Sequence, residues 1–191
     1  MKNSIKSTAN PQDWVALHAD CLYAFAITRI GDEEQARDLV QETFLSALEG
    51  LDKFEQKSSE RTWLTAILKN KIMDVYRKRS RQPITKSLHM PEAESQFFHS
   101  EMNNWKKEEW PAEFGIEEAD PLQYKELQTI LQACMKKLPP LWLSVFSMKH
   151  VDDESTTTIC SELKVSDSNF WAIIHRAKVN LRTCLQKNWN Y

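Results

Sequence analysis

The stretch "SDSNFWAIIHRAKVNLRTCLQ", residues 166–186, carries two kinds of side chain on what its periodicity predicts to be one helix. Its apolar residues recur at helical spacing and predict a buried stripe, namely Phe170, Ile173, Ile174, Ala177, Leu181, Cys184 and Leu185. The other side offers hydrogen-bonding, aromatic and cationic groups, namely Ser168, Trp171, Ala172, His175, Arg176, Lys178 and Arg182. These groups could contact base edges and phosphates, although an ordinary surface helix would also keep charges for solubility.

A second basic stretch, "RKRSR" at residues 77–81, closes another predicted helix. Trp63, Asn70 and Tyr76 are expected on the exposed side of that helix. Aromatic rings interleaved with cations favour stacking on separated bases. The alternative is a solvated helix end, where cations interact well with the helix dipole.

The distribution of charge is more informative than the net charge of -2. Residues 61–86 are basic, residues 87–120 are acidic, and the end of the chain, residues 176–191, is basic again, with four cations and no acid. This order predicts two modules that bind anions, joined by an acidic connector. Clustered local charge, and not a basic total, is what a polyanion requires.

Several kinds of chemistry find no support in the sequence. With 3 Gly and no GxGxxG or Walker-type motif, there is no visible nucleotide-binding loop. The five histidines form no HExxH and no i, i+4 pair, so we expect no metal, no cofactor and no catalytic residue.

The four cysteines are far apart and form no CxxC. With no signal peptide and no apolar run long enough to span a membrane, we expect a cytoplasmic protein with reduced thiols. Each cysteine lies in an apolar helical pattern, so each is expected to act as a small buried hydrophobe. A redox role for Cys160 and Cys184 is the alternative.

Three helices are predicted in the first part of the chain, at about 13–29, 33–49 and 61–81. Gly31 and Gly50 are expected to end the first two. The predicted buried residues are Trp14, Leu17, Cys21, Ala24 and Phe25 in the first helix, Ala36, Leu39, Val40, Thr43, Phe44, Ala47 and Leu48 in the second, and Leu64, Ile67, Leu68, Ile72 and Val75 in the third.

Four helices are predicted in the last part, at about 121–137, 141–150, 155–163 and 166–187. In the first of them Leu122, Leu127, Ile130, Leu131 and Cys134 are expected to face inward. The last two have helix-turn-helix spacing, which places the first turns of the second helix in a major groove. The sequence therefore predicts an all-α protein with two small helical domains, 1–82 and 121–191, joined by a long acidic, aromatic linker, 83–120.

Two long motifs resemble a known family. "DLVQETFLSALEGLDKF" followed by "RTWLTAILKNKIMDVYRKRSR" resembles region 2 of the sigma-70 family of RNA polymerase sigma factors, in its small extracytoplasmic-function (ECF) type. "LPPLWLSVFSMKHVDDESTTTICSELKVSDSNFWAIIHRAKVNLR" resembles region 4 of the same type. The segments "NNWKKEEWPAEF" and "RTCLQKNWNY" resemble a subgroup that pairs with a zinc-binding anti-sigma protein.

The resemblance implies a role for each matching position. Asp38, Gln41, Glu42 and Leu45 fall where the family docks on the β′ clamp helices of core RNA polymerase. Lys53 and Phe54, in the connector that holds a flipped base, and Trp63, Asn70, Asp74 and Arg77 fall where it opens and reads the −10 element. Ser168, Asn169, Trp171, Ala172, His175, Arg176, Lys178 and Arg182 fall on the helix that reads the −35 element.

The sequence departs from the family pattern at a few positions. Lys164 stands where the family often has a turn glycine, so a looser turn or another conformation is expected. Trp171 and Ile173 replace positions that are commonly cationic, which implies more apolar −35 contacts.

The function implied is promoter-specific initiation with core RNA polymerase, through the β′ clamp helices and the β flap, on promoter DNA. The main alternative is a stand-alone helix-turn-helix regulator, which would have no use for the face formed by Asp38 and Glu42. An enzyme is the least favoured class.

Overall fold

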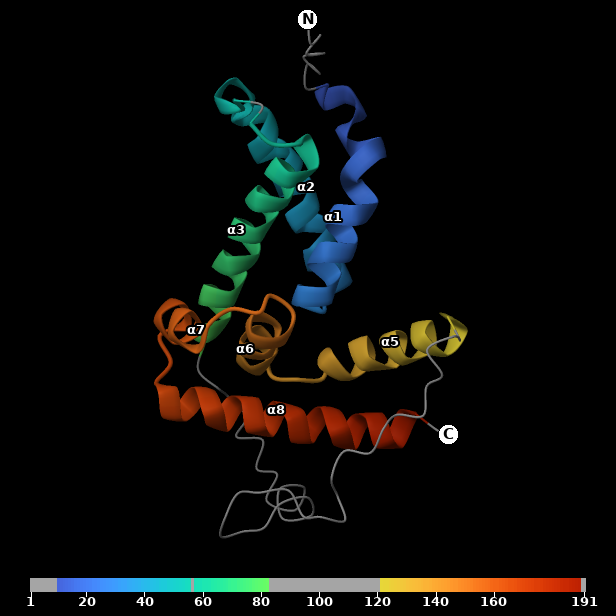
Figure 1. The fold of residues 1–191 in the computed structure, drawn as a ribbon, viewed down its shortest axis with the longest axis vertical. Helices are drawn as coiled ribbons and strands as arrows, with labels where there is room; N and C mark the ends of the chain where they lie inside the picture. The colour runs from blue at the N-terminus through green and yellow to red at the C-terminus, as the bar shows by residue number, and fades with distance from the viewer. Residues whose placement is uncertain (1–9, 56, 83–120, 190–191) are drawn as a thin grey trace, which may run out of the picture. The chain divides into compact units, whose positions relative to one another are not determined.

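The computed structural model describes residues 10–55, 57–82 and 121–189 (Figure 1). Within these ranges the chain forms helices and no strand, which confirms the predicted all-α class. It divides into two compact units, Met1–Val75 and Tyr76–Tyr191. The predicted domain limits stay predictions, and the predicted linker at 83–120 lies outside the described residues.

The first unit contains the 3-10 turns η1 (Pro11–Asp13) and η2 (Leu51–Lys53), the helices α1 (Trp14–Ile30) and α2 (Glu33–Glu49), and most of α3 (Glu60–Ser80), whose last five residues fall in the second unit. A short turn joins α1 to α2. Gly31 adopts a left-handed conformation (φ 73°) that suits glycine and ends α1. Asp32 then caps α2, because its Oδ1 accepts the backbone N–H of Gln35 at 2.8 Å.

The core of this unit is formed by one stripe from each helix. The buried residues are Trp14, Leu22, Ala26 and Ile30 of α1, Ala36, Leu39, Val40, Thr43 and Ala47 of α2, and Leu64, Leu68 and Ile72 of α3. The α2 and α3 stripes largely follow the predicted period. The buried hydroxyl of Thr43 donates to the carbonyl of Leu39 at 2.7 Å, so its polarity is satisfied inside the helix.

The predicted stripe of α1 was right for Trp14, which is buried, and wrong for its other four residues. Leu17 is 67% exposed and Ala24 is also exposed, while Cys21 and Phe25 are half-buried. The true stripe runs through His18, a polar residue between Trp14 and Leu22. Its Nε2 lies 3.7 Å from the carboxylate of Glu60 on α3. In α2, Leu48 was also predicted to be buried but is 49% exposed.

Gly50 ends α2 as predicted, but with φ −96° it does not adopt the left-handed conformation that Gly31 has. One expectation about α3 was wrong. Tyr76, which was expected on the exposed side of α3, is fully buried.

The second unit contains α5 (Pro121–Met135), α6 (Pro140–His150), α7 (Thr156–Leu163) and α8 (Asp167–Asn188). Helix α6 lies at its centre, with most of its residues buried. Helix α8 packs on α5, α6 and α7 and buries Phe170, Ile173, Ile174, Ala177, Val179 and Leu181. Val179 was not predicted to be buried and extends the stripe. The other five buried residues confirm the prediction.

The expected burial of α5 was wrong at its start. Leu122 was predicted to face inward, but it is 73% exposed, and Tyr124 beside it is also exposed. The helix is anchored near its other end, where Cys134 and Met135 are buried. Helical periodicity alone does not show how much of an amphipathic helix is covered.

The expectation of reduced thiols was wrong for two of the four cysteines. Cys134 of α5 and Cys184 of α8 form a disulfide, with Cα atoms 5.8 Å apart. Cys21 and Cys160 are free.

None of the helices described here is both long and apolar enough to cross a membrane. In the same residues, no group of three or more His, Cys, Asp or Glu side chains could hold a metal ion.

Candidate nucleic-acid and protein interfaces

The exposed side of α2 carries the predicted acidic face. Asp38, Gln41, Glu42 and Leu45 are all exposed, opposite the buried stripe of the same helix. Glu42 Oε2 lies 3.5 Å from the Lys71 ammonium of α3, so this carboxylate already has one cation beside it. The structure brings these four residues together as one surface of acids, an amide and an exposed leucine.

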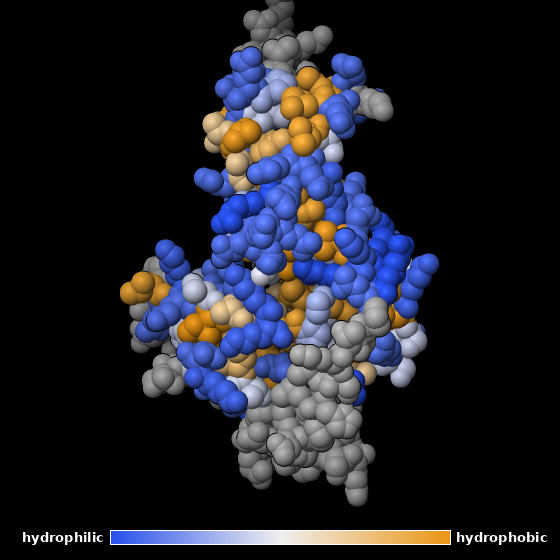
Figure 2. Space-filling view, turned by 180° about the vertical axis from the view of Figure 1, so that it is seen from behind, coloured by the Kyte–Doolittle hydropathy of each residue, from blue (hydrophilic) through white to orange (hydrophobic). Residues whose placement is uncertain are grey.

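Exposed apolar residues gather near the end of the unit where α1 begins (Figure 2). Val15 and Leu17 of α1 and Leu45 and Leu48 of α2 are the large hydrophobic side chains exposed here. The predicted face therefore continues beyond Leu45 into Leu48, which sequence periodicity had placed in the core. The acids and leucines that alternate over residues 38–49 were the sequence signal from which this longer face could have been predicted.

Trp63 is held between two other aromatic rings. It stacks on Phe54, with ring centroids 4.5 Å apart and planes inclined by 22°. The edge of Trp14 approaches it with centroids 5.8 Å apart. Gly50 lies close by, because a Cβ added there would come within 3.8 Å of the indole and 3.2 Å of the carbonyl oxygen of Ser46. Trp63 is therefore half-buried, and not simply exposed as predicted.

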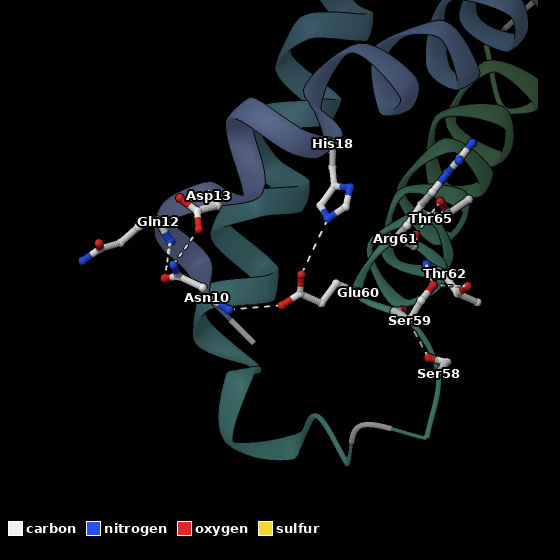
Figure 3. A network of polar contacts seen from close by, with 10 residues as sticks. All are labelled: Asn10, Gln12, Asp13, His18, Ser58, Ser59, Glu60, Arg61, Thr62 and Thr65. Carbon is white, nitrogen blue, oxygen red and sulfur yellow. Dashed lines mark hydrogen bonds and ion pairs between the residues drawn. The ribbon is translucent and has the colours of Figure 1, made fainter. Parts of the chain in front are cut away.

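A polar network ties the start of α3 to the start of the unit (Figure 3). Ser59 caps α3, since its Oγ accepts the backbone N–H of Thr62 at 3.2 Å. Glu60 Oε1 accepts the backbone N–H of Asn10 at 3.1 Å, and Glu60 Oε2 lies 3.7 Å from His18 Nε2. The connector that follows η2 is thus anchored at its C-terminal end to the segment before α1.

The other predicted −10 residues lie along α3 and η2. Asn70 and Asp74 are exposed one turn apart on α3, and Arg77 is half-buried nearer its C-terminus. Lys53 is the last residue of η2. The structure places Trp63, Asn70, Asp74 and Arg77 on one side of α3, as the predicted periodicity requires.

Helix α8 presents the predicted recognition residues at its N-terminal end. Ser166 caps it, since its Oγ accepts the backbone N–H of Asn169 at 3.3 Å. Five predicted contact residues are exposed, namely Ser168, Asn169, Trp171, Arg176 and Lys178, and three are half-buried, namely Ala172, His175 and Arg182. Trp171 is 59% exposed, with its ring edge-on to Phe170. The buried Phe170 thus supports the exposed indole.

The turn between α7 and α8 uses a lysine in a glycine-like conformation. Lys164 has φ 53° and ψ 43°, and its backbone N–H donates to the carbonyl of Cys160. The backbone N–H of Val165 donates to the same carbonyl at 3.2 Å. The turn is therefore as tight as one with glycine at this position. The expected looser turn does not occur.

The structure adds one cation and one imidazole beside the α8 surface that the sequence did not single out, namely Lys149 and His150. His150, at the end of α6, has its pKa lowered by partial burial and then by the nearby charges of Lys178 and Lys149, which favours its neutral form. Lys149 and Lys178 therefore flank a neutral imidazole that can donate or accept a hydrogen bond. In the sequence, the only sign of this arrangement is the pair "KH" that ends the helix predicted at 141–150. That the pair lies near Lys178 could not be predicted, because it depends on tertiary packing.

Comparison with known proteins gives matches over both units. Residues 14–82 match the family model described as Sigma-70 region 2. A probable RNA polymerase sigma factor of Haemophilus influenzae is 34% identical over 166 residues, which cover 87% of this chain and 84% of that protein. The ECF RNA polymerase sigma factor SigW of Bacillus subtilis is 25% identical over 174 residues, covering 91% and 88%.

A solved complex of the sigma factor RpoE with the anti-sigma factor NepR, from Bartonella quintana, is more distant. The match covers 92% of this chain and 96% of that one, with 20% sequence identity and a TM-score of 0.42. The curated relatives, which match in sequence along most of their own length, are what decide the family. They confirm the resemblance: the chain belongs to the sigma-70 family of RNA polymerase sigma factors, in its extracytoplasmic-function group.

Proposed function

We propose that this sigma factor binds core RNA polymerase through α2, captures unstacked −10 bases beside Trp63, and reads a −35 element with the first turns of α8. It would do so in the cytoplasm and without a catalytic residue of its own. The stand-alone regulator is not favoured, since the relatives are sigma factors.

The observation that carries the proposal is the exposed α2 face. Asp38, Gln41, Glu42 and Leu45 project from a helix whose opposite side is buried in the core. An acidic face with exposed leucines suits a protein partner that offers cations around an apolar groove. Duplex DNA would repel it, so this face and the basic α8 surface serve different partners.

The aromatic group around Trp63 supports the −10 role. Capturing a base requires a flat apolar ring and a nearby connector that can close on it. Trp63 and Phe54 supply the rings, and the connector ends at the cap formed by Ser59. Asn70 and Asp74 lie exposed further along α3, where they can meet base edges or backbone.

The α8 surface supports the −35 role. Ser168, Trp171, Ala172 and His175 lie in its first three turns and can contact base edges and thymine methyl groups. Arg176, Lys178 and Arg182 follow and suit phosphates, and Lys149 of α6 extends that basic surface.

The zinc-binding anti-sigma partner stays a prediction. The segment "NNWKKEEWPAEF" that indicated it lies outside the described residues. An anti-sigma would have to cover the α2 face, the α8 face or both to block promoter binding.

The test of docking is the affinity for purified core RNA polymerase, measured by fluorescence anisotropy of the labelled chain. The double variant Asp38→Ala/Glu42→Ala should bind core at least about tenfold more weakly, equal to about 1.4 kcal/mol. Its unfolding free energy should fall by no more than about 1 kcal/mol, because the exposed Lys71–Glu42 pair is a surface ion pair.

The matched control is Glu33→Ala, which removes an exposed acid of the same helix that pairs with Arg37. It should bind core like the wild type. Equal affinities for the double variant, the control and the wild type would refute the assignment of the α2 face.

A further inference from the structure

The Cys134–Cys184 disulfide joins two helices that are far apart in sequence. The two residues are separated by 50 positions and lie near the C-terminal ends of α5 and α8. Cys134 is 2% exposed, whereas Cys184 is half-buried. Cys184 is therefore the more accessible residue of the pair.

The bond lies at the place where α5 is held. Among the α5 residues whose burial is described, Cys134 and Met135 are buried, while the start of the helix exposes Leu122 and Tyr124. Leu127, Ile130 and Leu131 are only half-buried, so the covalent link adds to limited packing of α5 on α8. Helix α8 is the one that carries the proposed −35 surface at its other end.

The surroundings of Cys184 favour exchange. The Lys137 ammonium lies 3.8 Å from its Sγ, and the side-chain amide nitrogen of Asn188 lies 3.6 Å from it. When the bond is reduced, a cation and a hydrogen-bond donor at these positions stabilise a thiolate, which is the form that attacks disulfides.

Cys160 offers a contrast within the same unit. Burial, and then a hydrogen bond with the Asp167 carboxylate, raises the pKa of this thiol. Unlike Cys184, which has a cation and an amide beside its sulfur, Cys160 therefore has a disfavoured thiolate form. This makes it a suitable internal control.

We propose that Cys134 and Cys184 are a reversible thiol–disulfide pair whose oxidation by a small-molecule disulfide fixes α5 on α8 and stabilises the −35-binding unit. The proposal rests on the proposed function, because that function places the chain in the reducing cytoplasm. Disulfides of mesophilic proteins in that compartment are usually transient and redox-sensing, not permanent.

The chemistry balances with a disulfide such as oxidised glutathione as the oxidant. The Cys184 thiolate attacks one sulfur of the oxidant, forming a mixed disulfide and releasing one glutathione thiolate. The Cys134 thiolate then attacks the Cys184 sulfur and releases the second glutathione. Two electrons pass from the cysteine pair to the oxidant, and the two protons lost by the cysteines end on the released thiols.

Oxidation should stabilise the unit because a cross-link over 50 residues restricts the unfolded chain. For a unit of this size we expect the oxidised chain to melt about 10–20 °C higher than the reduced chain. At temperatures between the two midpoints, the oxidised form would keep its −35 surface and the reduced form would lose it.

The experiment uses the full chain equilibrated with oxidised or reduced glutathione. Peptide mapping after alkylation identifies the linked cysteines, and circular dichroism follows melting. Expected results are a Cys134–Cys184 peptide in the oxidised sample, its loss in reduced glutathione, and the difference in melting temperature. Cys160→Ser should keep the whole response, and Cys134→Ser/Cys184→Ser should lose it.

Three results would overturn the proposal. One is alkylation of all four cysteines after oxidation, another is a link that reduced glutathione cannot open, and the third is equal melting in both redox states. Because the wild type is compared with itself, these outcomes do not depend on whether the double variant folds.

A transcription readout separates this proposal from the proposed function. Holoenzyme with core polymerase is preincubated between the two melting temperatures and then assayed. Activity that survives only in the oxidised wild type supports the switch, whereas equal survival in both redox states refutes it. No transcription in any sample, while the redox-dependent melting persists, would refute the proposed function and leave the thiol pair standing.

Discussion

The indole of Trp63 stacks on the phenyl ring of Phe54, at a centroid distance of 4.5 Å, while Trp14 meets it edge-on. Phe54 follows η2, in the connector between α2 and α3, and Trp63 lies in the first turn of α3. The stack therefore links the connector between α2 and α3 to the start of α3. A captured base would enter next to rings that are already in place, at little ordering cost.

Trp63→Leu should impair promoter opening, because leucine retains apolar packing but provides no stacking surface. Base–aromatic stacking is worth about 1–3 kcal/mol per base, so opening should fall by about 5- to 150-fold. Permanganate reactivity of −10 thymines measures it. Trp63→Phe, which keeps an aromatic ring, is the control and should lose much less. Wild-type opening by Trp63→Leu would contradict the capture site.

Substitutions on α8 should separate base reading from phosphate anchoring. Trp171→Ala or His175→Ala should change which −35 base is preferred, at about 1–3 kcal/mol per lost contact. Lys178→Ala or Arg182→Ala should weaken all promoters alike and reduce the salt slope by about one unit. Transcription from a promoter library at two salt concentrations distinguishes them. If Lys178→Ala alone shifted the base preference, the proposed orientation of α8 on the −35 element would be wrong.

Lys164→Gly should stabilise the second unit. Lys164 holds φ 53°, a left-handed conformation that costs a non-glycine residue about 1–2 kcal/mol. Glycine avoids that cost but loses about 0.5–1 kcal/mol of chain entropy, which leaves a net gain of up to about 1.5 kcal/mol. Denaturant unfolding measures it. Lys164→Ala, which keeps a Cβ, should gain nothing, and equal stability of the Gly and Ala variants would contradict the argument.

His150 should make the second unit less stable in acid. Partial burial, Lys178 and Lys149 lower the pKa of this side chain when folded, relative to about 6.5 when unfolded. The unfolded chain then binds more protons, so stability is complete above pH 6.5 and falls as the pH drops toward the lower, folded pKa. The effect should be small because the side chain is largely exposed.

Melting of wild type and His150→Gln at pH 7.5 and pH 5 checks this effect. The wild type should lose more of its melting temperature on acidification than the variant does. An equal loss would show that other groups cause the pH dependence.

The α8 surface could be predicted from sequence because its buried positions are all apolar and Ser166 caps it. The acidic face of α2 followed from the same periodicity. In α1 the reasoning failed, because apolar residues on several sides offer more than one stripe and the true stripe contains His18. Only the partner on α3, Glu60, shows why a polar residue can occupy that place.

Contacts between residues distant in sequence could not be predicted. Nothing in the spacing of Cys134 and Cys184 distinguishes them from the free cysteines, because packing of α5 on α8 alone brings them within bonding distance. The same holds for His150 beside Lys178. Likewise, Phe54 and Trp63 were both predicted to serve the −10 element, but their mutual stacking depends on how the connector folds back.

The most direct test of the account is run-off transcription with purified core RNA polymerase and this chain. The template carries a −10 and −35 promoter selected from a library by the holoenzyme. We expect transcripts that start at one position, depend on adding the chain, and disappear with Asp38→Ala/Glu42→Ala but not with Glu33→Ala. A chain that binds the promoter by itself as a dimer, and gives no transcripts above core polymerase alone, would contradict the account.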